Sequence, residues 1–402
     1  INWTAGYRSL KFDVEQAGLV GLGDVLSVDL QGVSVEMNSF KTPTGAYIDY
    51  QASFGDEGLE LATGGESVFI DFDERIGIRA KVAWAEFALA EFLYLEGSFV
   101  FSQGTQKQFV AADTGLIGDL TEGVLPVPID RIYHDLEIMT IGAIDVSGFA
   151  GIGDWKSDDR VGLAIDNASF GMALLKPTGI GGLVIPGLEN VLPTYVAVKA
   201  QVESAGLVGF EDFMDVRVEG IEVNINTSSI PGLPPAAALL PMPFIDFTQT
   251  RLGLPGLEDI SEILDLVYPT WEDGFLGDLI GPVFGPNGLE ISTGREGSEI
   301  FIDFDSEIIQ AKAEYIHGDI FGVLQIAGSM GFTKRGAEQV VTANGDVRTV
   351  TSLALGLTNV YGFAGIGGYW EVNPETNRID GSRTNDSAMG LAIDNLSIGA
   401  VM

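Results

Sequence analysis

Ten residues occur twice in this chain in nearly the same form, and this repetition constrains the fold more than any other feature of the sequence. Residues 162–171 read GLAIDNASFG, and residues 390–399 read GLAIDNLSIG. Three further motifs recur in the same order: VEQAGLVGLGD at 14–24 and VESAGLVGFED at 202–212, VFIDFDE at 68–74 and IFIDFDS at 300–306, and GFAGIG at 148–153 and 362–367. The shared order indicates two copies of one structural unit.

The repeats predict a division of the chain into two β units and a linker. The first unit covers 1–178 and the second 194–402, and the linker, 179–193, lies in a stretch rich in glycine and proline. Stacked repeats normally need polar capping units, and neither end of the chain shows one. We therefore expect an in-phase segment of a longer repeated protein. A free-standing protein of two repeats is the alternative.

Most of the chain has the patterns of β-strands. Residues 27–38 and 215–226 alternate apolar and polar side chains, with one glycine in the middle of each. Residues 79–101 are also compatible with a helix. Their counterpart at 310–332 contains several glycines together with Ile and Val, so the aligned pair indicates strands.

The repeated decapeptide predicts a bend within a strand. The alternation of Leu163 and Ile165 is out of phase with that of Ala168 and Phe170, across Asp166–Asn167. A second slip of this kind occurs at Thr358–Asn359. Such a slip at an Asx residue indicates a bulge or a corner. We expect an all-β, elongated tandem-repeat architecture of the β-solenoid type, with a long antiparallel meander or sandwich as the alternative.

One segment of the second unit departs from the β pattern. It forms an insert at about 229–286, in which Leu257, Ile260, Ile263 and Leu264 have helical spacing after Pro255. We expect one or two short helices there.

Composition excludes several classes of function. The chain has 57 acidic and 21 basic residues and a net charge of -36, so nucleic acid and anionic membrane surfaces are not expected partners. It has no cysteine, which excludes disulfides, thiolate metal sites and a cysteine nucleophile. No apolar run is long enough to span a membrane, and the N-terminal residues lack the pattern of a signal peptide.

Residues 195–226, the paired FIDFD, GFAGIG and the repeated decapeptide resemble repeats of giant, acidic, cysteine-free bacterial cell-surface or secreted proteins of the adhesin type. The resemblance implies an extracellular or cell-surface location and a structural or adhesive role. Its implied partners are neighbouring repeats or like subunits in a rod or fibre. Such families often use calcium, although the nonapeptide GGxGxDxUx typical of many of them is not found in this sequence.

Carboxylates suggest calcium as the cofactor, since hard cations need several oxygen ligands. Asp71 and Asp73 alternate with apolar residues, which predicts that both leave one face of a strand, and Asp303 and Asp305 repeat this spacing. The segment GDWKSDDR offers three more candidates on a loop: Asp154, Asp158 and Asp159. The alternative is a solvated acidic face on a highly acidic protein.

No catalytic motif stands out, and we expect a protein without enzymatic activity. The sequence has no GxSxG or HExxH motif, and faithful duplication suits structural repeats better than catalytic machinery. The glycine-rich GFAGIG motifs indicate close sheet packing or a bend rather than a phosphate loop.

The alternative function is a carbohydrate-binding or polysaccharide-degrading module on a β-solenoid, with a surface polysaccharide as partner. Trp155, Tyr369 and Trp370 would then stack on sugars; packing between repeats is the interpretation that we favour for them.

Overall fold

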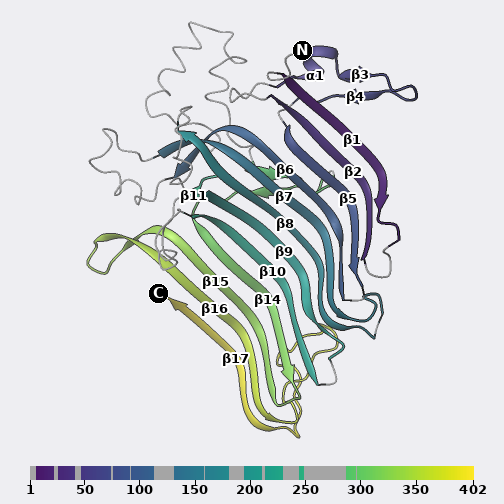
Figure 1. The fold of residues 1–402 in the computed structure, drawn as a ribbon. Coiled ribbons are helices and arrows are strands. Elements are labelled where there is room, and N and C mark those ends of the chain that lie inside the picture. Colours follow the sequence, from purple (N-terminus) through teal and green to yellow (C-terminus); the bar gives the residue numbers. More distant parts are fainter. Residues whose placement is uncertain are drawn as a thin grey trace.

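The computed structural model of the chain describes residues 6–21, 26–40, 47–73, 76–90, 92–112, 131–157, 159–180, 194–210, 213–229, 244–248, 287–295 and 297–402. Its main feature is one 13-stranded sheet whose long strands lie side by side in a strongly curved array (Figure 1). Every strand pair among the described residues of this sheet is antiparallel. The all-β prediction is therefore confirmed.

Each repeat contributes six strands to the main path of the sheet, in chain order. The first repeat supplies β1 (Tyr7–Gly18), β2 (Leu26–Phe40), β5 (Ile76–Leu89), β6 (Leu93–Ala112), β7 (Arg131–Ile152) and β8 (Val161–Ile180). The second supplies β9 (Thr194–Val208), β10 (Met214–Ser229), β14 (Ile308–Ile320), β15 (Leu324–Val341), β16 (Val347–Ile366) and β17 (Met389–Val401).

Smaller elements lie between the second and third long strands of each repeat. In the first repeat these are α1 (Tyr50–Phe54) and the hairpin of β3 (Leu59–Leu61) and β4 (Val68–Ile70). In the second they are β11 (Phe244–Ile245), which pairs with β6, and the hairpin of β12 (Leu289–Ile291) and β13 (Ile300–Ile302).

The two repeats join through direct strand pairing. The last strand of the first repeat, β8, pairs with the first strand of the second, β9, from Gly162 opposite Val208 to Leu175 opposite Tyr195. The sheet is therefore continuous across the repeat boundary. Of the linker, residues 181–193 lie outside the described residues, and the boundaries at 178 and 194 stay predictions.

The β-solenoid expectation is not confirmed. Coils of a solenoid stack their strands in parallel, whereas strands that follow one another here pair antiparallel, which is the meander given as the alternative. Residues 79–89 and 93–101 belong to strands β5 and β6, as the aligned repeats predicted. The helical residues predicted at 254–284 lie outside the described residues, and the described part of that insert contains the short strand β11.

A line of left-handed residues crosses the sheet at matched positions of the two repeats. Each residue has a positive φ within a long strand, and the pairs are Gly32 and Gly220, Gly97 and Gly328, Asp145 and Asn359, and Asn167 and Asn395. Asn, Asp and Gly tolerate this conformation best. The predicted slips at Asp166–Asn167 and Thr358–Asn359 are confirmed, because Asn167 has φ 50° and Asn359 φ 52°.

One side of the sheet, which we call the apolar side, carries an unbroken row of paired apolar residues across all twelve strands of the main path. The row is Val14, Val33, Val82, Phe99, Ala143, Phe170, Ala200, Val223, Ala311, Phe332, Leu355 and Ala400. Beyond the left-handed residues a second row runs through Val28, Phe87, Leu95, Gly148, Ile165, Ala205, Val218 and Ile316.

On every strand that carries both rows except β6, the two rows have opposite parity, and on β2, β7, β8 and β10 a left-handed residue lies at this change of phase. A bulge shifts the alternation by one residue, so the same side of the sheet can stay apolar along the whole strand. A contact on the other side supports this. Arg295, in the hairpin that covers the first part of the strands, places its guanidinium 5.7 Å from the Trp84 ring in the second part. The residues that alternate with the two apolar rows therefore lie on one and the same side of the sheet, which we call the covered side.

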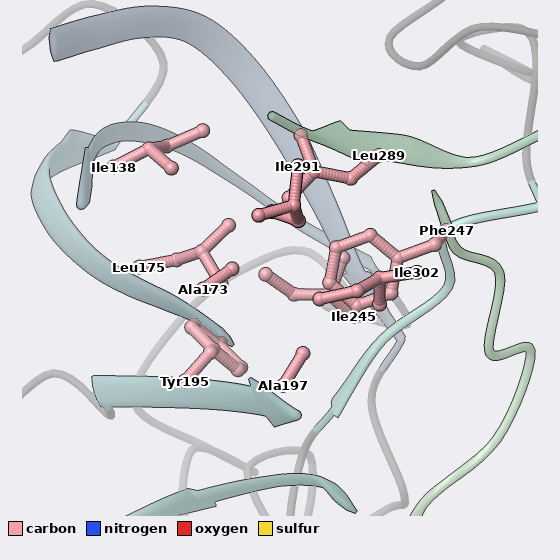
Figure 2. Packing of buried hydrophobic residues seen from close by; sticks show 10 residues of the cluster. All are labelled: Ile138, Ala173, Leu175, Tyr195, Ala197, Ile245, Phe247, Leu289, Ile291 and Ile302. Atoms are coloured by element: carbon pink, nitrogen blue, oxygen red, sulfur yellow. The ribbon is translucent and has the colours of Figure 1, made fainter. Parts of the chain in front are cut away.

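The packed clusters of described residues lie on the covered side. In the largest, Ile138, Leu175 and Tyr195 of the sheet pack against Ile291 of β12 and against Phe247, which follows β11 (Figure 2). Full burial of a large apolar side chain contributes roughly 1.5–3 kcal/mol. This cluster thus helps to hold the small elements of the second repeat on the sheet.

The GFAGIG motifs lie within strands and pack closely. A side chain at Gly151 would collide with the Phe149 ring and with the backbone of Gly162 in the neighbouring strand. Gly365, Phe363 and Gly390 repeat this arrangement. The motifs are strand-packing sites, as predicted, because an aromatic ring lies over a glycine in each repeat.

Candidate functional site

An equivalent lysine–aspartate ion pair occurs in each of the two repeats. Lys11 Nζ in β1 lies 2.8 Å from Asp71 Oδ1, and Lys199 Nζ in β9 lies 3.0 Å from Asp303 Oδ1. Both aspartates follow the end of a hairpin strand by one residue, whereas the sequence predicted them within a strand. Each ion pair connects a hairpin to the first strand of its repeat, so these two candidate calcium ligands already have a cation.

The other predicted ligands are dispersed. Asp305 accepts a hydrogen bond from Ser306 Oγ at 3.0 Å, and Asp154 accepts one from the Lys156 backbone N–H at 2.9 Å in a turn after β7. Asp73 and Asp159 are exposed. Asp158 lies outside the described residues.

Across the part of the chain that the structure describes, no group of three or more His, Cys, Asp or Glu residues is placed to hold a metal ion. The described aspartates lie in separate places, at the ends of two hairpins and in the turn after β7. Calcium binding by them stays a prediction.

A loop of the second repeat, residues 367–388, packs on the covered side. Its Trp370 is 5% exposed and donates from Nε1 to the Gly362 carbonyl at 2.9 Å. The Gln325 side chain donates to the Trp370 carbonyl and accepts from the Trp370 backbone N–H, both at 3.0 Å. In the first repeat Trp155 stacks on Tyr94 with ring centroids 3.8 Å apart. Both tryptophans proposed for sugar stacking therefore take part in packing.

A cavity of about 560 Å³ lies between this loop and the sheet. Arg378 at its wall donates from Nη2 and Nε to Glu219 Oε2 at 2.6 and 2.9 Å, and it lies over the Tyr315 ring. Asp380 accepts from the Ser382 hydroxyl and backbone and from Asn373, and these hydrogen bonds lower the pKa of Asp380 to about 2. Arg378 thus fastens the loop to β10, whereas the carboxylate of Asp380 holds the loop to itself.

A second cavity, of about 270 Å³, contains a buried histidine. His317 is 2% exposed; its Nε2 lies 3.2 Å from Asp215 Oδ2, and its Nδ1 lies 3.3 Å from the Tyr315 hydroxyl. The hydrogen bond with His317 lowers the pKa of Asp215, against the opposite effect of burial. Both ring nitrogens have partners within the chain, and the contact with Asp215 connects β14 to β10.

The comparisons with known proteins add no relative. No family model, no curated protein and no solved structure matches this chain. The conclusions on function therefore depend on the geometry of the chain itself. As to membranes, the described residues contain no helix with the length and apolar character that a span requires.

The apolar side extends over all twelve strands of the main path, and it is exposed even on interior strands. Leu163 in β8 is 45% exposed, Ile326 in β15 is 52% and Leu95 in β6 is 39%. Large contiguous apolar patches on soluble proteins mark sites of contact with apolar partners. We take this side as the candidate functional surface.

Sequence reasoning did not identify this surface, although its signal was present. The slip of alternation at Asp166–Asn167 was interpreted as a bend, but the conclusion that it keeps apolar residues on one side was not drawn. The pairs of Arg378 with Glu219 and of Lys334 with Glu307 were also missed, since their members are far apart in sequence or hidden among many charges.

Proposed function

We propose that this chain is a structural and adhesive repeat segment of a large extracellular bacterial surface protein or fibre. The observation that carries the proposal is the pairing of β8 with β9, which merges two homologous repeats into one sheet. Each repeat extends that sheet by six strands.

The composition supports a location outside the cell. A chain without cysteine has no thiol to be oxidised there, and a net charge of -36 keeps a large β-sheet protein soluble. In the proposal, neighbouring repeats or like subunits are the partners along the sheet.

The adhesive part of the proposal uses the apolar side. Interior residues such as Leu163 and Ile326 are about half exposed, so an apolar partner surface can reach them without unfolding the sheet. Burial of apolar area stabilises such a contact by roughly 25 cal/mol per Å² before the cost of association.

We propose that this chain has no enzymatic activity. Two carboxylates at the larger cavity, Glu219 and Asp380, are hydrogen-bonded to residues of the loop. A glycosidase needs an acid and a second carboxylate at a defined separation across a substrate. The polysaccharide alternative is tested by a screen of polysaccharides for binding and cleavage.

Labelling of the producing bacterium tests the location and the structural role together. Antibodies against this chain should label intact cells or shed fibres, and the parent gene should contain further copies of the repeat. Labelling confined to lysed cells, or cleavage of a polysaccharide by the purified chain, would overturn the proposal.

A further inference from the structure

The two outer strands of the main sheet are counterparts of the two strands that join the repeats. In the described residues β17 has a neighbour on one side, β16, and β1 has one neighbour, β2. The sequence of β17 corresponds to that of β8, through GLAIDNLSIG and GLAIDNASFG, and β1 corresponds to β9, through VEQAG and VESAG. Since β8 pairs with β9, the free edge of β17 matches the free edge of β1.

The β8–β9 junction predicts the register of such a contact. In that junction Leu163 lies opposite Leu207, and Ser169 opposite Gln201. When Gly390 is aligned with Gly162, and Val14 with Val202, the corresponding pairs are Leu391 with Leu19 and Ser397 with Asp13. All of these positions are accessible, with Leu391 70% and Leu19 48% exposed.

The polar contacts of the junction have equivalents at the edges. Asn167 Nδ2 donates to Glu203 Oε2 at 2.8 Å, and Ser204 Oγ donates to Asp166 Oδ2 at 3.2 Å. In the corresponding register Asn395 would lie opposite Glu15, and Asp394 opposite Gln16. Both edge pairs combine an amide donor with a carboxylate acceptor, whereas the second pair of the junction has a serine hydroxyl as donor.

We propose that a second copy of this chain adds its β1 to β17, antiparallel and in this register, so that copies associate head to tail. This inference names the partner of the structural function proposed above and rests on it. A head-to-tail contact that does not close into a ring forms a filament. Pairing of like edges has no counterpart among the described strands, where an edge of the β8 type meets an edge of the β9 type.

Charge determines the conditions for association. Two copies of net charge -36 repel each other at low ionic strength, and salt screens this repulsion within about 10 Å at 0.1 M. The average mass in sedimentation should therefore rise with sodium chloride. The variants Phe12→Asp and Ile398→Asp, on the two edges, should each abolish this rise, whereas Gln201→Asp on an interior strand should not. A constant monomer mass at all salt concentrations would overturn the proposal.

Disulfide trapping tests the register, and the absence of cysteine gives a clean background. Asp13→Cys with Ser397→Cys should form a ladder of linked copies on oxidation. Gln201→Cys with Ser169→Cys, the equivalent positions of the junction, should form an intrachain disulfide and no ladder.

Leu19→Cys with Ser397→Cys is the control for register and should not link. A ladder from this control, or dimers of equal yield from either single cysteine, would contradict head-to-tail pairing. Surface labelling of cells does not depend on these results. A chain that labels the cell surface but stays monomeric refutes the contact and leaves the structural function standing.

Discussion

Lys334 Nζ and Glu307 Oε1 lie 2.6 Å apart, with the two side chains 9% and 1% exposed. Glu307 immediately precedes β14, and Lys334 belongs to β15, so the pair connects two neighbouring strands of the second repeat. In the first repeat the position after FIDFDE is Arg75, so a carboxylate is not repeated there. A buried ion pair of this kind is costly to break and easier to replace as a whole.

We expect Lys334→Met to lower the free energy of unfolding by about 3–5 kcal/mol, because it leaves a buried carboxylate without its ammonium. The double variant Glu307→Leu with Lys334→Met should recover most of that loss. Urea denaturation measures both. Arg348→Met is the control, since its partner Asp346 is exposed and the change should cost under about 1 kcal/mol. Equal losses for the single and double variants would contradict this interpretation.

Calcium and magnesium should raise the melting temperature equally at equal ionic strength. Lys11 and Lys199 already neutralise Asp71 and Asp303, so divalent ions act by screening the net charge of -36. Thermal melting with each ion and with a chelator measures this. A shift specific to calcium, lost on chelation, would instead support the calcium site that the sequence predicted.

Substitution of a left-handed residue should lower the stability of the fold only when the new side chain is β-branched. Asn359 has φ 52°, where such side chains are strained by roughly 1–2 kcal/mol. Asn359→Val should lose about that much stability, whereas Asn359→Gly should stay within a few tenths of a kcal/mol of the parent. Denaturation curves of the two variants decide, and an equal loss would mean that the asparagine side chain matters more than the backbone angle.

An environment-sensitive apolar dye should bind the native chain. Leu163→Glu and Ile326→Glu place a charge on the apolar side, and each should reduce dye fluorescence severalfold without changing the melting temperature by more than a few degrees. Gln201→Glu adds the same charge on the covered side and should leave the fluorescence unchanged. Dye binding that is insensitive to all three variants would remove the apolar side as a binding surface.

Acid should weaken the contact of Asp215 with His317. A lowered pKa in the folded state stabilises the fold above the unfolded value, near pH 3.9, and this stabilisation is lost as pH falls through the folded pKa. The stability difference between the parent and Asp215→Asn should therefore be largest near neutral pH and shrink below about pH 4. Urea denaturation at pH 7 and pH 3 measures it; a constant difference would show that the charge of Asp215 is not involved.

Much of the fold could be predicted from the sequence because its signals are local or repeated. Strand alternation, the duplicated motifs and the Asx bend at Asn167 were each visible in short stretches. The strand order was harder, because a strand–Asn–strand pattern is compatible with both parallel coils and an antiparallel meander. The antiparallel pairing of β8 with β9 distinguishes them, and it depends on contacts across the repeat boundary.

The candidate sites were less predictable because acidic residues are so abundant. Asp71 and Asp303 have the spacing of cation ligands, but their lysine partners are far away in sequence, 60 and 104 residues apart. The match of lysine to aspartate in both repeats was nonetheless present in the aligned motifs. A search for basic residues at equivalent positions of the two copies could have found it.

The matched left-handed residues place a bend at the same position along the strands of both repeats. In units joined by edge pairing, this line of bends would continue from one unit to the next. The assembled sheet would then keep a constant cross-section whatever its length. The length of the assembly could then change by the addition or loss of whole units, while the shape of the side that contacts a surface stays the same.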